Sequence, residues 1–106
     1  MNVINLTDAV IRGDMWSQVI NISMDSQDFT DVTPTATLIQ NGRVVSGVTP
    51  VSTRVSGGVG IGVISVTLTS THTSTMNPGA YSVRVRISTS SWGPYTILTL
   101  NFNLIN

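Results

Sequence analysis

The sequence predicts an all-β protein, an antiparallel immunoglobulin-like β-sandwich of about seven strands, on three observations. Val, Ile and Thr supply 39 of the 106 residues, whereas Lys and Glu are absent and Ala occurs three times. Good helix formers are therefore scarce, and the β-branched residues that favour strands dominate. Apolar and polar residues alternate along several segments, and Gly, Pro and Asn separate these segments. We expect residues 1–106 to form a single domain with no helix.

The first half of the chain contains four candidate strands. A short strand is expected at Val3–Leu6, and a longer alternating strand at Met15–Met24. Ala36–Gln40 and Arg43–Val48 flank the dipeptide Asn41-Gly42. Because both residues tolerate positive φ, this dipeptide is the strongest short-range signal of a β-hairpin.

The second half contains three further strands, at Val59–Thr69, Ala80–Ser88 and Tyr95–Ile105. Each has one apolar and one polar face, as the strands of a sandwich require. The side chains expected in the core from these strands are Ile64, Val66, Leu68, Tyr81, Val83, Val85, Ile87, Leu98, Leu100, Phe102 and Leu104. The Gly-rich segment Val51–Gly62 is irregular and has no readable register. A small β-barrel is the alternative fold, because alternation does not distinguish a closed sheet from two packed ones.

The surface implied by this composition is poor in charge. Charged residues make up 9% of the chain and the net charge is zero, whereas about 25% is usual in soluble proteins. Such a surface is poorly protected against association, so we expect partner proteins to cover much of it. We expect no nucleic-acid partner, because no basic patch with interleaved aromatic residues is present. We expect no membrane partner, because no apolar run approaches the ~18 residues that a membrane span needs.

Residue types that carry catalysis are almost absent. With one histidine and no Cys, Lys or Glu, most catalytic constellations cannot be built, so we expect no enzyme and no cofactor. His72 is expected in an exposed loop without partners for metal binding. Asp25, Asp28 and Asp31 do not follow the 1-3-5 spacing of a calcium loop, which indicates a polar strand connection. The run Gly57–Gly62 lacks the Lys and the helix of a phosphate loop, which favours close backbone packing or a mobile loop.

Three residues are candidate partner contacts: Arg84, Arg86 and Trp92. Arg84 and Arg86 share the polar face of one predicted strand, where short polar neighbours lose little side-chain entropy on association. Arginine can donate paired hydrogen bonds to a partner's carboxylate, although solvated charges are the simpler interpretation. Trp92 lies at a hairpin tip beside Gly93-Pro94, where it can contact a partner or fold back over the open end of the sandwich. In a second hypothesis, Trp92 is the stacking platform of a carbohydrate- or cell-surface-binding module.

Three motifs occur in a particular order along Arg12–Ile87. Arg12-Gly13-Asp14-Met15-Trp16 opens an alternating strand, Asp28-Phe29-Thr30-Asp31-Val32-Thr33 is a polar turn that enters a strand, and Pro78-Gly79-Ala80-Tyr81 follows a Thr-rich segment. This order resembles the small immunoglobulin-like accessory domains of bacteriophage virions, of the tail, baseplate or capsid-decoration type.

The resemblance implies a non-enzymatic structural protein of the virion, synthesised in the host cytoplasm. It also implies a homo-oligomer that contacts other virion proteins and copies of itself. The absence of a signal peptide in Met1–Arg12 and the absence of cysteine both fit synthesis in a reducing compartment. The triplet Arg12-Gly13-Asp14, which also matches the tripeptide that integrins recognise, is expected to form a turn.

Overall fold

The computed structural model describes residues 2–6, 8–90 and 92–106, and side chains within residues 5–6, 8–23, 27–90 and 92–106. The side chain of Met24, which ends the predicted strand Met15–Met24, lies outside these residues. The described elements are β1 (Asn2–Asn5), β2 (Val10–Ile11), β3 (Trp16–Asp28), β4 (Thr33–Gln40), β5 (Arg43–Val44), β6 (Val51–Leu68), α1 (Ser70–Thr75), β7 (Gly79–Ser88) and β8 (Tyr95–Ile105).

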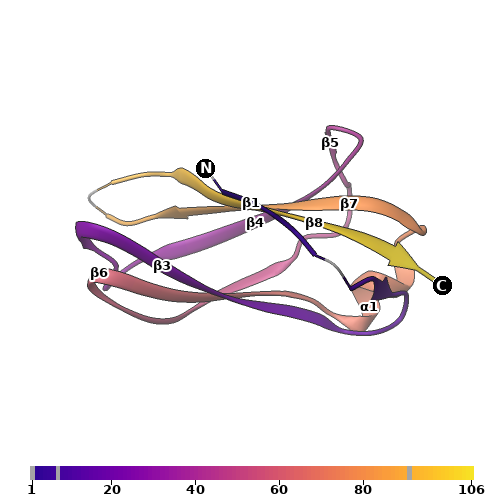
Figure 1. The fold of residues 1–106 in the computed structure, drawn as a ribbon, viewed down its shortest axis with the longest axis horizontal. Coiled ribbons are helices and arrows are strands. Elements are labelled where there is room, and N and C mark those ends of the chain that lie inside the picture. Colours follow the sequence, from indigo (N-terminus) through magenta and orange to yellow (C-terminus); the bar gives the residue numbers. More distant parts are fainter. Residues whose placement is uncertain (1, 7, 91) are drawn as a thin grey trace.

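The strands form two layers, which Figure 1 shows nearly edge-on. Sheet A has the order β1-β8-β7-β4-β5, with β2 also paired to β8, and sheet B consists of β3 and β6. The pairs β4–β5, β4–β7, β7–β8 and β3–β6 are antiparallel, whereas β1 and β2 run parallel to β8. The predicted all-β sandwich is therefore confirmed, and the alternative of a small barrel is excluded because the two sheets do not close on each other.

The register of β7 and β8 follows the predicted alternation. Every side chain that the sequence assigns to the core from these two strands is buried. From β6, Ile64, Val66 and Leu68 are fully buried against them. Phe102 joins the two layers: its ring stacks on Trp16 of β3 at a centroid distance of 5.5 Å and on Tyr81 of β7 at 5.8 Å. The core thus forms where the apolar faces of both sheets meet.

The predicted hairpin at Asn41-Gly42 is present between β4 and β5. Asn41 has φ 54° and Gly42 has φ 77°, as a turn with two positive φ angles requires. The second strand is shorter than expected, because β5 ends at Val44 and not at Val48. The chain turns again at Gly47, which has φ 83°. This hairpin rises above the outer side of sheet A (Figure 1).

The expectation of an irregular segment at Val51–Gly62 is wrong, because β6 continues from Val51 to Leu68. Eighteen extended residues span about 59 Å, which exceeds the 43 Å long axis of the molecule. The strand therefore bends back at one end of the sandwich, as Figure 1 shows. A Cβ at Gly57 would overlap the carbonyl oxygen of Phe29, and one at Gly62 would lie 3.1 Å from the Phe29 ring. The close backbone packing expected for the Gly-rich run is confirmed.

The expectation that the chain has no helix is also wrong. Ser70–Thr75 forms the six-residue helix α1, which begins with a capping box. The Thr69 hydroxyl accepts from the backbone N–H of His72 at 3.2 Å, and Nδ1 of His72 accepts from the N–H of Thr69 at 3.2 Å. These bonds satisfy helix-end N–H groups and offset the low helix propensity of Ser and Thr. No helix in the described part of the chain is long and apolar enough to cross a membrane.

Candidate functional site

Arg84 and Arg86 lie on the outer face of sheet A, on its central strand β7. Both side chains are exposed, as predicted. Arg84 lies opposite Thr37 and Thr99, and Arg86 lies opposite Thr35 and Thr96, on the neighbouring strands β4 and β8. Within the described residues, neither arginine side chain takes part in a hydrogen bond or an ion pair. We call this group of two arginines and four threonines the arginine face.

A row of amide and hydroxyl side chains continues this face along sheet A. Ser82 donates to Oδ1 of Asn101 at 2.6 Å, and the Asn101 amide donates to Oδ1 of Asn5 at 2.9 Å. These residues and the Asn41-Gly42 turn line a hollow of about 390 Å³. The outer side of sheet A is therefore a polar surface that carries two cationic groups and no described carboxylate.

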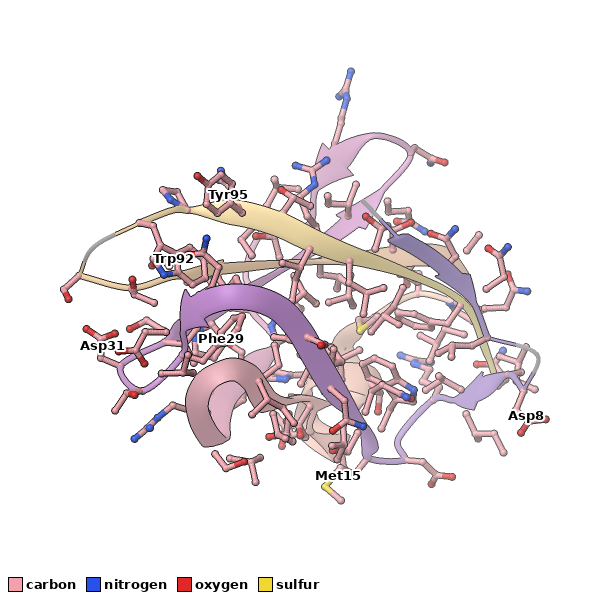
Figure 2. The ribbon with its side chains drawn as sticks, turned by 60° about the vertical axis from the view of Figure 1, so that its left-hand side comes forward. Asp8, Met15, Phe29, Asp31, Trp92 and Tyr95 are labelled. Atoms are coloured by element: carbon pink, nitrogen blue, oxygen red, sulfur yellow. The ribbon has the colours of Figure 1, made fainter. Side chains whose placement is uncertain are left out.

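Trp92 folds back over one end of the sandwich. Its indole is half-buried, meets Phe29 edge-on at 5.5 Å and stacks on Tyr95 at 5.7 Å. Figure 2 shows these three rings together near Asp31. The fold-back interpretation of Trp92 is confirmed, and the more accessible ring is Tyr95, which is 54% exposed. Tyr95 is not among the candidate contacts predicted above, although its position directly after Pro94 at a strand start was a usable signal.

Asp28, the last residue of β3, and Asp31, in the connection from β3 to β4, lie at the same end. Oδ1 of Asp28 accepts from the hydroxyl and from the backbone N–H of Thr30, the latter at 2.9 Å. Oδ2 of Asp31 accepts from the hydroxyl of Ser90 at 2.6 Å and from its N–H at 3.3 Å. These hydrogen bonds lower the pKa of both carboxyl groups below the ordinary value of 3.8. We call Asp28, Asp31 and Ser90 the acidic end.

A hollow of about 530 Å³ lies beside the acidic end, with Gln27, Thr30, Thr89 and Trp92 also in its lining. The expected polar strand connection is therefore present at this position. Among the described residues, no three His, Asp, Glu or Cys side chains are grouped to hold a metal ion. The side chain of Asp25 lies outside these residues.

The outer face of sheet B differs from that of sheet A because its described residues between positions 17 and 23 of β3 and their partners on β6 are uncharged and partly apolar. Ser17, Val19, Asn21 and Ser23 of β3 lie opposite Thr67, Ser65, Val63 and Ile61 of β6. Val19 is 57% exposed and Ile61 is 59% exposed. Exposed aliphatic side chains on a sheet that has only two strands are available for contact with another molecule.

The Arg12-Gly13-Asp14 triplet has a structural role at the opposite end of the sandwich. Arg12 donates to the carbonyl oxygen of Ser74 from Nε at 3.2 Å and from Nη2 at 3.0 Å. The hydroxyl of Thr73, which is fully buried, accepts from the N–H of Gly13 at 3.0 Å and donates to the carbonyl oxygen of Asp14 at 2.8 Å. The expected turn is confirmed, with Gly13 at φ 93°, and it attaches β2 to α1.

His72 is half-buried in α1, which corrects the expectation of an exposed loop. The helix cap described above explains the difference, because it requires the imidazole to turn back toward Thr69. The Nδ1 atom is therefore occupied as a hydrogen-bond acceptor. This gives His72 a local structural role in the helix.

Comparison with known proteins supports the sandwich architecture of the chain. No protein-family model matches the chain, and no curated protein matches it. Among solved structures, it is similar to a family 123 glycoside hydrolase from Clostridium perfringens that was studied for glycolipid glycan hydrolysis, with a TM-score of 0.64 and 14% sequence identity. The alignment covers 100% of this chain and 23% of the hydrolase chain. At this identity the similarity establishes a shared sandwich architecture alone.

We predict that the protein loses folding stability at low pH because Asp28 and Asp31 become protonated. A carboxyl group with a lowered folded-state pKa contributes stability that is fully present above its unfolded pKa and is lost as the pH falls through the folded-state pKa. In Asp28→Asn/Asp31→Asn, the amides still accept hydrogen bonds but no longer titrate. The midpoint of thermal unfolding should therefore fall less between about pH 5 and pH 2 in this variant than in the wild type. Asp8→Asn, at an exposed carboxylate near the other end (Figure 2), is the control. Identical pH profiles for the wild type and the double variant would contradict the role of these hydrogen bonds.

Proposed function

We propose that this chain is a non-enzymatic structural protein of a bacteriophage virion, a capsid-decoration protein or a tail or baseplate component. It works through protein–protein contacts with other virion proteins and with copies of itself. The observation that carries the proposal is the arginine face. Two guanidinium groups that have no partner among the described residues lie there among threonines, on the exposed side of the sheet.

The physical properties of this face suit a permanent contact. Threonine side chains have few rotamers to lose, so ordering them on association costs little free energy. An arginine can align two N–H groups with one carboxylate, which fixes the orientation of a partner as well as binding it. Because β4 and β8 flank β7, neither arginine lies at a frayed sheet edge. The face therefore presents both arginines from a strand that is paired on both sides.

The motifs behind the virion resemblance support the proposal in a second way, because each has a role in holding the fold. Arg12 and Gly13 attach the N-terminal segment to α1, as described above. In the motif that opens β7, the Tyr81 hydroxyl donates to the carbonyl oxygen of Asn77 at 2.6 Å while its ring packs in the core. Residues that serve the scaffold are what a structural module requires, whereas a catalytic module needs converging polar groups in a cleft.

We predict that Arg84→Glu leaves the protein folded but impairs its incorporation into particles. The side chain points away from the core, so thermal unfolding of the free variant should match the wild type within about 0.5 kcal/mol. Reversing the charge at a contact that pairs with a carboxylate introduces repulsion, and incorporation should fall at least about tenfold. The measurement is the amount of the chain in purified virions, by quantitative mass spectrometry.

Arg43→Glu is the matched control, because Arg43 is exposed on β5 and lies outside the arginine face. It should be incorporated normally. Absence of the wild-type chain from purified particles would overturn the proposed function. Normal incorporation of Arg84→Glu would show that the arginine face is not the contact.

A carbohydrate- or cell-surface-binding module is the second candidate function, favoured by the rings at the acidic end. Tyr95 is exposed and backed by Trp92, and the hollow beside them offers carboxylate and hydroxyl groups that could accept or donate hydrogen bonds. Aromatic faces next to such groups are suited to sugar rings. In this hypothesis Tyr95 supplies the platform, and Trp92 supports it from the core.

For the carbohydrate hypothesis, we predict binding on a glycan array that Tyr95→Ala abolishes. Trp92→Ala should weaken binding and also lower the unfolding temperature, because the indole packs against Phe29. Met15→Ala, which alters a side chain that is 67% exposed elsewhere on the molecule, serves as the control and should bind normally. An array without signal, or a Tyr95→Ala variant that binds as the wild type does, would exclude this candidate.

A further inference from the structure

The molecule carries two charged surfaces of opposite sign at separate places. The arginine face lies on the outer side of sheet A, and Arg84 and Arg86 are two residues apart on one face of β7, about 6.6 Å from Cα to Cα. Neither guanidinium has a partner among the described residues. Two neighbouring cations with free donors are complementary to two neighbouring carboxylates.

The acidic end supplies such a pair. Asp28 and Asp31 are both exposed, and each uses one carboxylate oxygen in the hydrogen bonds from Thr30 or Ser90. The bonds to Oδ1 of Asp28 and to Oδ2 of Asp31 hold each carboxylate in orientation, and the second oxygen of each is left to accept from a partner. The nearby cation Arg54 is already engaged, since its Nη1 donates to the carbonyl oxygen of Thr30.

We propose that the arginine face of one copy docks the acidic end of a second copy, so that Arg84 and Arg86 pair with Asp28 and Asp31. This inference rests on the proposed function, in which the chain assembles in several copies, and it names the partner surface. A second copy is the occupant because the chain itself supplies both complementary surfaces, while its net charge of zero leaves no overall repulsion between copies. The hollow of about 530 Å³ beside the carboxylates gives space for a guanidinium group, and the indole of Trp92 lines it.

The geometry makes this a head-to-face contact, not a twofold one. The two surfaces are on different parts of the molecule, so each copy can offer its acidic end to one neighbour and its arginine face to another. A contact of this heterologous kind forms a ring if the rotation closes and a filament if it does not. This contact gives the two exposed arginines of β7 a specific partner surface.

The test is a charge exchange between two variants, followed by light scattering. Arg84→Asp/Arg86→Asp makes the arginine face acidic, and Asp28→Arg/Asp31→Arg makes the acidic end basic. Each variant alone should self-associate at least about tenfold more weakly than the wild type. An equimolar mixture should associate again, because the acidic face of one variant is complementary to the basic end of the other. Association should weaken between about 0.01 M and 1 M salt, as the Debye length falls from about 30 Å to about 3 Å.

Two control variants change charge outside both surfaces, and a milder variant of the acidic end covers the case in which the charge reversal prevents folding. Arg43→Asp and Asp8→Arg make the same charge changes at exposed positions outside both surfaces and should associate as the wild type does. If Asp28→Arg/Asp31→Arg does not fold, Asp28→Asn/Asp31→Asn removes the charges while keeping hydrogen-bond acceptors, and it should also associate at least about tenfold more weakly.

A wild-type chain that stays monomeric at low salt, or folded variants that do not complement each other in the mixture, would overturn this inference. The same monomeric chain found in purified virions would leave the proposed function intact. Absence from virions together with salt-sensitive complementation in solution would overturn the virion assignment and support the contact.

Discussion

The packing of Phe29 against the glycines of β6 is the contact on which much of the rest depends. Phe29 is fully buried, its backbone N–H donates to the carbonyl oxygen of Gly58 at 2.9 Å, and its ring fills the space left open at Gly62. The backbone can approach this closely only because Gly57 has no side chain. Phe29 also meets Trp92 edge-on, so one residue connects sheet B with the β7–β8 loop of sheet A. Tight packing at this position orders the whole end of the sandwich.

The same contact also positions the two carboxylates of the acidic end. Asp28 directly precedes Phe29, and Asp31 follows it by two residues, so a fixed Phe29 leaves both carboxylates little freedom. The bond from Ser90 to Asp31 then ties the β3–β4 connection to the β7–β8 loop. The arginine face is fixed differently, by strand pairing on both sides of β7. Two surfaces of opposite charge are thus each held by a rigid part of the scaffold, as directional contacts between subunits require.

Alternation along the chain was enough to predict the sandwich, the inward faces of β7 and β8, and the exposure of Arg84 and Arg86, because a period of two determines which side chains share a face. It could not predict that β1 and β2 pair in parallel with β8, since pairing partners far apart in sequence leave no local pattern. Helix α1 was missed because its stability comes from Thr69, His72 and Thr73 contacts and not from helix propensity. The acidic end could not be predicted from the sequence, because Ser90, which donates to Asp31, lies 59 residues away along the chain.

The most direct test of this account compares alanine at two adjacent glycines of β6. A Cβ at Gly57 would overlap the backbone of Phe29, whereas one at Gly58 would meet nothing within 4 Å. Gly57→Ala should therefore lower the free energy of unfolding by about 1–3 kcal/mol, as overpacking does, and should speed amide exchange at residues 27–32 and 88–90. Gly58→Ala should change the free energy of unfolding by no more than about 0.5 kcal/mol. Equal effects of the two substitutions, or unchanged amide exchange at the acidic end in Gly57→Ala, would contradict the central role of Phe29.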